Sequence, residues 1–107
     1  MLDQEGKITL DRAADEYLPL EWFDDADVEI DISSADIRFI VDNGFTLIPA
    51  TNPGNPKGRL LHFTEAHALS LKSNTRDYML LLTEGTDSTV LFRGKISATG
   101  FAVVSLQ

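Results

Sequence analysis

The stretch DYMLLLTEGTDSTVLFRGKI, residues 77–96, carries the strongest structural signal in the sequence. Two runs rich in apolar and β-branched residues flank Glu-Gly-Thr-Asp at residues 84–87, which is the pattern of a β-hairpin. Side chains alternate between the two faces of a strand, so Tyr78, Leu80 and Leu82 are predicted to share one face. The matching face of the returning strand is predicted to hold Val90, Phe92, Gly94 and Ile96.

Upstream of this hairpin the same period of two recurs. Apolar and polar residues alternate or form short strand-like runs at positions 8–11, 18–22, 27–32, 35–42, 45–48 and 59–63. Alternation of this kind is typical of half-buried strands. Asp42-Asn43-Gly44 is a turn signal between two of these runs, because Asn and Gly accept positive φ at low cost. Residues 101–105 are predicted to continue as a last strand.

Two segments break the strand pattern. Residues 64–71 begin with Thr64, whose side chain can cap a helix, and predict one or two helical turns. Residues 49–58 hold three of the four prolines and two glycines, and predict an exposed loop. The sequence therefore predicts an all-β fold, a single antiparallel β-sandwich over residues 1–107 with one short helical turn.

Length and charge limit the classes of function. A chain of 107 residues is long enough for one core and too short for two. It has no cysteine, which excludes disulfides and cysteine-based zinc sites. The net charge is −8, with thirteen acids and three bases in residues 1–42. A strongly acidic chain repels nucleic acid and anionic lipid, so neither nucleic acid nor a membrane is expected as a partner.

The acidic segment DDADVEIDISSAD, residues 24–36, holds six carboxylates and invites comparison with a calcium loop. A calcium-binding EF-hand loop beginning at Asp25 needs glycine at its sixth position for a sharp turn, and that position is Ile30. On a strand, the acids would point the same way, about 7 Å apart. We therefore expect the solvated face of an edge strand, with an incidental cation site at Asp24 and Asp25 as the alternative.

Catalytic groups are sparse. The two histidines, His62 and His67, are five residues apart, and with Glu65 they fit none of the common zinc patterns. The sequence contains no Gly-x-Ser-x-Gly motif and no glycine-rich phosphate loop. We therefore predict that the protein is not an enzyme and has no catalytic residues, no cofactor and no resident metal.

Three aromatic residues leave two interpretations open. Tyr17, Trp22 and Phe23 could form a platform for a carbohydrate or another small ligand. Alternatively, Trp22 anchors the core, as a tryptophan does in many β-sandwiches. The second interpretation is favoured, and a ligand-binding module remains the alternative function.

Three segments in order resemble a recurring phage pattern. Residues 31–41, DISSADIRFIV, resemble an Asp-Leu-Thr/Ser step followed by a Val-Arg-Phe strand. Residues 59–71 resemble a strand, threonine and short-helix step, and residues 77–96 resemble the Tyr-x-x-x-Leu hairpin that follows it. Together, over residues 7–97, the chain resembles the immunoglobulin-like module at the N-terminus of phage baseplate upper proteins. Ser34 and Asp77 stand where members of that family often have glycine.

The resemblance implies an immunoglobulin-like sandwich and a structural role in the virion, after synthesis in the host cytoplasm. Expected partners are other virion proteins, such as portal, tail, baseplate or capsid subunits, and copies of the chain itself in a homo-oligomer. Segments 1–6 and 98–107 are candidate contact arms. The residues predicted to bind partners are Asp24, Asp25, Asp27, Glu29 and Asp31 on the acidic face, and Asn52, Pro53, Asn55, Pro56 and Lys57 in the proline-rich loop.

Overall fold

The computed structural model describes residue 2 and residues 6–100, and it confirms an all-β fold with one short helix. The larger sheet has the strand order β1 (Ile8–Asp11), β10 (Asp87–Thr99), β9 (Arg76–Glu84), β5 (Asp36–Val41) and β6 (Thr46–Leu47). A second sheet has the order β2 (Glu16–Leu20), β8 (Arg59–Phe63) and β7 (Ala50–Thr51). A small hairpin pairs β3 (Trp22–Phe23) with β4 (Glu29–Ile30).

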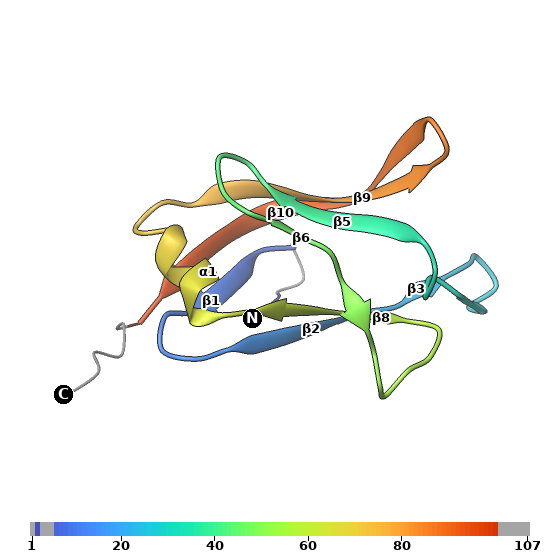
Figure 1. Cartoon of the computed structure of the whole chain (residues 1–107), viewed down its shortest axis with the longest axis horizontal. Coiled ribbons are helices and arrows are strands. Elements are labelled where there is room, and N and C mark those ends of the chain that lie inside the picture. Colours follow the sequence, from blue (N-terminus) through green and yellow to red (C-terminus); the bar gives the residue numbers. More distant parts are fainter. Residues whose placement is uncertain (1, 3–5, 101–107) are drawn as a thin grey trace.

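The larger sheet curls over the second sheet, and the core lies between them (Figure 1). Phe39 of β5 stands at its centre, edge-on to Phe63 at a ring distance of 5.3 Å and stacked on Tyr78 at 4.9 Å. Ile37, Phe39 and Val41 are all buried, as their alternation in the sequence predicts. The predicted turn at residues 42–44 then returns the chain into β6, with Asn43 at a φ of 52°.

The predicted hairpin is formed by β9 and β10, but its register changes within β10. Gly85 and Thr86 make the turn, and Phe92 and Gly94 lie opposite Leu80 and Tyr78, as predicted. A β-bulge lies between Val90 and Phe92, however, so Val90 lies opposite Leu81. The prediction that Val90 shares a face with Phe92 is therefore wrong. The extra residue is Leu91, which turns toward the core.

The strand pairing is antiparallel except between β1 and β10, which run parallel from Ile8 opposite Ile96 to Asp11 opposite Thr99. The sheet is therefore mixed, in contrast to the antiparallel sandwich predicted from the sequence.

Where the chain enters β1, the Tyr78 hydroxyl donates a hydrogen bond of 2.5 Å to the Gly6 carbonyl. Gly94 is required there, because a Cβ would overlap both of these oxygens. The immunoglobulin-like arrangement stays a prediction.

Two further segments differ from the sequence-based expectation. The predicted edge strand at residues 27–32 is reduced to Glu29–Ile30, and residues 24–28 form a turn. The predicted loop at residues 49–58 contains the short strand β7 before the loop proper.

The predicted helical turn is α1 (Glu65–Ser70), capped by Thr64 as expected. Within the described part of the chain, no helix has the length and apolarity needed to span a membrane.

The predictions for the two ends of the chain fall largely outside the described residues. The expected last strand at 101–105 lies entirely there. So does most of the two candidate contact arms, of which the structure describes residues 2, 6 and 98–100. Residues 98 and 99 belong to β10 rather than to an arm.

Candidate interaction surface

The two segments predicted to bind partners lie together at one end of the molecule (Figure 1). We call this the hairpin end and define it as the β3–β4 hairpin with its turn, residues 22–30, and the loop at residues 52–58. The Ile32 amide donates a hydrogen bond of 2.9 Å to the Lys57 carbonyl, which ties the strand-like segment after the hairpin to the loop. The acidic stretch and the proline-rich loop therefore form one surface.

Asn55 joins the hairpin to the loop. Its side-chain Nδ2 donates to one carboxylate oxygen of Glu21 at 2.6 Å and to one of Glu29 at 2.7 Å. Its Oδ1 accepts from the Lys57 amide at 3.1 Å, so the whole side-chain amide is engaged. Asn55 is half-buried and structural, whereas Pro53, Pro56 and Lys57 around it are exposed. Asn52 is also half-buried, and its Oδ1 accepts from the Gly54 amide at 2.9 Å.

Arg59 fixes the base of the same end from inside. Its guanidinium is buried and donates to the carbonyls of Pro49 and Ala35, at 3.2 Å from Nε and 2.9 Å from Nη1. Longer contacts of Nη1 reach the carbonyls of Ile32 and Ser33. A planar donor fork suits several carbonyls at once, so one side chain holds two chain segments in place.

The predicted acidic face is not a row on one strand. Asp24 closes the hairpin turn, since its Oδ1 accepts from the amides of Ala26 at 2.8 Å and Val28 at 3.0 Å. Asp31 accepts from the amide and hydroxyl of Ser33, and these bonds, followed by the charge of Lys57, lower the Asp31 pKa below its usual value. Asp25 and Asp27 are exposed on the turn, where Asp27 has a φ of 60°.

These carboxylates are therefore spread over a turn and a loop. Among residue 2 and residues 6–100, no three His, Asp or Glu side chains come close enough to hold a metal ion. The hairpin end is instead a surface whose backbone is held by its own acids and amides.

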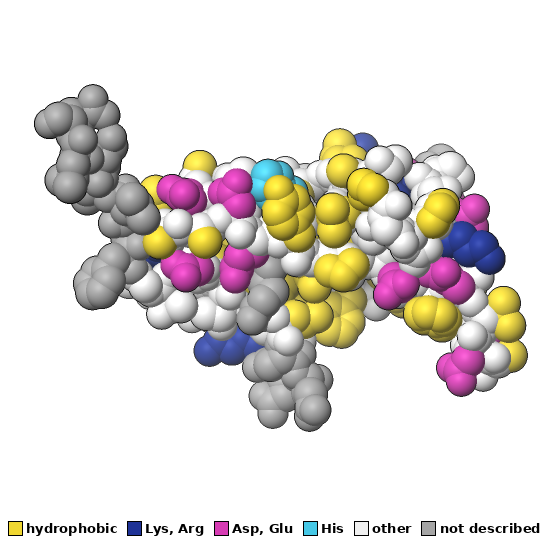
Figure 2. Space-filling model, turned by 90° about the horizontal axis from the view of Figure 1, so that it is seen from below, with side chains coloured by type: hydrophobic (Ala, Val, Ile, Leu, Met, Phe, Trp, Pro, Cys, Tyr) yellow, Lys and Arg dark blue, Asp and Glu magenta, His cyan; other side chains and the backbone are white. Residues whose placement is uncertain are grey.

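The sequence interpretation missed the exposed apolar side chains of this end. Val28 is 58% exposed and Phe23 is 51% exposed, and Ile30 is also open to solvent. Figure 2 shows apolar, acidic and basic side chains side by side at this end. The alternation at 27–32 predicts an apolar face turned inward, but among the described residues no second layer covers Val28 and Ile30.

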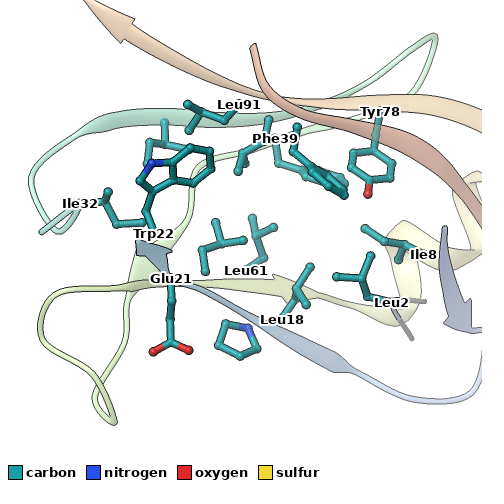
Figure 3. Close-up of a pocket in the computed structure, with 15 residues that line it drawn as sticks. Leu2, Ile8, Leu18, Glu21, Trp22, Ile32, Phe39, Leu61, Tyr78 and Leu91 are labelled. Atoms are coloured by element: carbon teal, nitrogen blue, oxygen red, sulfur yellow. The ribbon is translucent and has the colours of Figure 1, made fainter. Parts of the chain in front are cut away.

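A separate apolar pocket of about 220 Å³ opens between the two sheets (Figure 3). Trp22 and Leu91 lie at one end of it and Leu2 and Ile8 at the other, with Leu18 and Leu61 along the second sheet. The Glu21 carboxylate points away from the cavity, toward Asn55. Trp22 is 36% exposed, so the prediction that it is the central core anchor is wrong. Phe39 holds that position instead.

The three aromatics of the predicted ligand platform do not lie on one surface. Trp22 lines the pocket, and Phe23 is its neighbour on β3, so its side chain points to the opposite face of that strand. Tyr17 stacks on His62 at a ring distance of 4.4 Å, and His62 in turn contacts Asp15 at 3.3 Å. Tyr17 does not line the pocket.

His67 belongs to the helix cap. Its Nδ1 accepts from the Thr64 amide at 3.0 Å, while its own amide donates to the Thr64 hydroxyl at 3.4 Å. Burial, followed by the nearby His62, lowers the His67 pKa. The two histidines therefore have separate structural contacts and form no joint site.

Comparison with protein-family models, with curated proteins and with solved structures finds no match for this chain.

Proposed function

We propose that this protein is a non-enzymatic structural subunit of a phage virion that docks onto other virion proteins through its hairpin end. The virion setting comes from the ordered resemblance of residues 31–41, 59–71 and 77–96 to the phage module. The choice of the hairpin end is supported by the exposure of its side chains. The single observation that carries it is the exposure of Phe23, Val28 and Ile30 on one short hairpin, beside carboxylates whose backbone is held in place.

This chemistry suits a protein partner. Interfaces combine an apolar centre with a polar rim, and aromatic side chains such as Phe23 are common anchors. Ordering a loop on binding costs free energy. The hydrogen bonds of Asn55 and Arg59 already order this end in the folded protein, so binding does not have to order it. Charged groups at the rim, including Asp25, Asp27 and Lys57, add specificity for a complementary surface.

The first test is quantitative mass spectrometry of purified particles from the source culture, with the copy number measured against the major capsid protein. A ring-sized copy number supports a neck, tail or baseplate position, and a capsid-scale number supports a decoration role. Absence from particles would contradict the virion assignment.

The second test locates the docking surface. Particles are assembled with the double variant Phe23→Ser/Val28→Ser, and we expect its incorporation to fall about tenfold or more. The matched control is Leu69→Ser, an exposed apolar residue on α1 at the opposite end of the molecule. Equal incorporation of both variants would rule out the hairpin end as the docking surface, whatever the result of the first test.

The pocket supports a second candidate, the binding of a small ligand. Its lining is apolar, so it suits an apolar molecule better than a carbohydrate, whose hydroxyls need polar partners. Trp22 is the only tryptophan of the chain and lies at the pocket, which makes its fluorescence a direct probe. A blue shift on adding an apolar probe, such as an anilinonaphthalene dye, supports this candidate. An unchanged spectrum together with no bound dye would exclude it.

A further inference from the structure

Among the described residues, the larger sheet has no strand beside part of β10, which borders the apolar pocket. β10 runs from Asp87 to Thr99, but β1 pairs only with its last four residues, from Ile96 onward. At Gly6, which has a φ of 82°, the described chain leaves the line of β1, and Leu2 forms an isolated bridge back to Ile8. Among the described residues, no strand pairs with the outer edge of β10 between Asp87 and Phe92.

On the other side of this opening lies β2, the edge strand of the second sheet. Leu18 and Trp22 lie across it from Leu91 (Figure 3), and Leu20 and Phe92 also line the pocket. Pro19 removes one backbone donor from β2, so β10 offers the more complete edge for another strand. The opening therefore combines an unpaired strand edge with an apolar floor, which are the two features that strand addition uses.

We propose that this opening accepts segment 101–107 of a second copy of the chain, added as a strand beside β10. The segment reads FAVVSLQ, carries no charged side chain and is rich in residues that favour strands. Its apolar side chains match the lining of the pocket, whose one carboxylate, Glu21, is already turned toward Asn55. The other residues outside the described part of the chain, 1 and 3–5, form shorter stretches and include Asp3 and Glu5.

The segment of the same chain cannot make this contact. The described chain ends at Gly100, at the end of the molecule opposite the β3–β4 hairpin (Figure 1). Phe92 lies eight residues back along β10, about 26 Å at the rise of a strand. Seven extended residues span at most about 25 Å, and reversing direction uses some of them. Residues 101–107 therefore fall short of Leu91 and Phe92 of their own chain.

Each copy offers one opening and one segment. Two copies can therefore exchange segments reciprocally in a closed dimer, or the contacts can run head-to-tail into a larger ring or a filament. This inference goes beyond the proposed function, because it concerns self-association at the pocket and not docking at the hairpin end. Either can fail without the other.

The experiment is sedimentation velocity on the full chain over a hundredfold dilution series, with Trp22 emission recorded in parallel. Two variants separate the two halves of the contact. Phe92→Ser alters the opening and leaves the segment intact, while Val103→Asp/Val104→Asp alters the segment and leaves the opening intact. Leu69→Ser is the matched control for the first, because Phe92 and Leu69 are both 44% exposed.

We expect the wild type to self-associate, with Trp22 emission shifting to the blue as the protein is concentrated. Each variant alone should associate about tenfold or more weakly, while Leu69→Ser associates like the wild type. Mixing the two variants should give a dimer that grows no further, because only one working opening and one working segment remain. Far-ultraviolet circular dichroism checks that each variant folds.

Three outcomes would overturn the proposal. One is a wild type that stays monomeric throughout the series. Another is a pair of folded variants that associate as strongly as the wild type. The third is a mixture of folded variants that forms no dimer, although each variant alone has lost association.

Discussion

The middle of the molecule and the hairpin end are stabilised by different interactions. In the middle, Phe39, Phe63 and Tyr78 pack face and edge between the two sheets with almost no contact with water. At the hairpin end, the segments are joined by the side chains of Arg59 and Asn55, while Phe23 and Val28 remain exposed. Apolar burial builds the scaffold, and directional hydrogen bonds shape the surface.

This contrast between the two regions explains how a short chain can keep apolar side chains available for a partner. Where burial stabilises a region, its apolar residues are already used. Where hydrogen bonds to buried or half-buried polar groups stabilise it, those residues remain free to bind. Substitutions in the two regions should therefore differ in kind, with large losses of stability in the middle and losses of binding at the hairpin end.

The largest expected effect is at the centre of the core. Phe39→Ala removes a fully buried ring and leaves a cavity beside the existing pocket, so we expect a loss of about 3–5 kcal/mol in the free energy of unfolding. Urea denaturation followed by circular dichroism measures it. The matched control is Phe23→Ala at the hairpin end, where the loss should be about 0.5 kcal/mol or less. Equal losses in the two variants would remove the contrast between the regions.

The next effect is at Arg59. Arg59→Met keeps an unbranched apolar stem but removes the guanidinium, which leaves the carbonyls of Pro49 and Ala35 without their donor, so a loss of about 2–3 kcal/mol is expected. The same denaturation experiment applies. Arg38→Met serves as control, because Arg38 is exposed and its ion pair with Asp36 at 3.5 Å contributes little. An Arg59→Met protein as stable as the control would show that burial, not hydrogen bonding, holds this end.

A smaller and more local effect is expected at Asn55. Asn55→Ala removes both donors from Glu21 and Glu29, with a loss of about 1 kcal/mol. Amide hydrogen exchange should quicken at residues 52–58 and in the hairpin, while β5 and β9 keep their protection. Asn74→Ala, after the turn that follows α1, should change neither. Uniform faster exchange over all strands would mean that Asn55 supports the whole fold and not one surface.

The sequence predicts those parts of the fold that have a local cause. Alternation in β5 predicts its buried face, the Asn43-Gly44 turn predicts the return into β6, and Thr64 predicts the start of α1. Each signal lies within a few residues of the structure that it specifies. The hairpin of β9 and β10 is also predicted by local signals. The bulge at Leu91 is not, because no residue type near it indicates a bulge.

The remaining features depend on contacts between distant segments. Parallel pairing joins β1 to a strand almost ninety residues away, and nothing in residues 8–11 indicates the direction. Alternation at 27–32 indicates two faces but not whether another layer covers one of them, so Val28 and Ile30 were assigned to the wrong environment. Asn55, one of the predicted contact residues, stabilises the structure instead. This role follows only from its hydrogen bonds to Glu21 and Glu29, which lie far away in the sequence.

The smallest expected effect concerns pH and the cap of α1. His67 occupies the position where a capping box usually has Glu or Gln, and only its neutral ring can accept from the Thr64 amide. Because burial lowers the His67 pKa in the folded protein, the unfolded chain binds more protons between that pKa and the usual value of 6.5. The stabilisation is therefore fully present above pH 6.5 and is lost as the pH falls through the pKa of the folded protein.

Substitution of His67 by glutamine separates this effect from general acid denaturation. Gln accepts the same hydrogen bond at every pH, so His67→Gln should keep the helix cap and flatten the decline in stability just below pH 6.5. The denaturation midpoint, measured in steps from pH 7.5 to about 5, should fall less steeply for the variant than for the wild type. Parallel curves would assign the decline to groups other than His67. The hairpin end contains no histidine, so it should contribute nothing to the difference between the two curves.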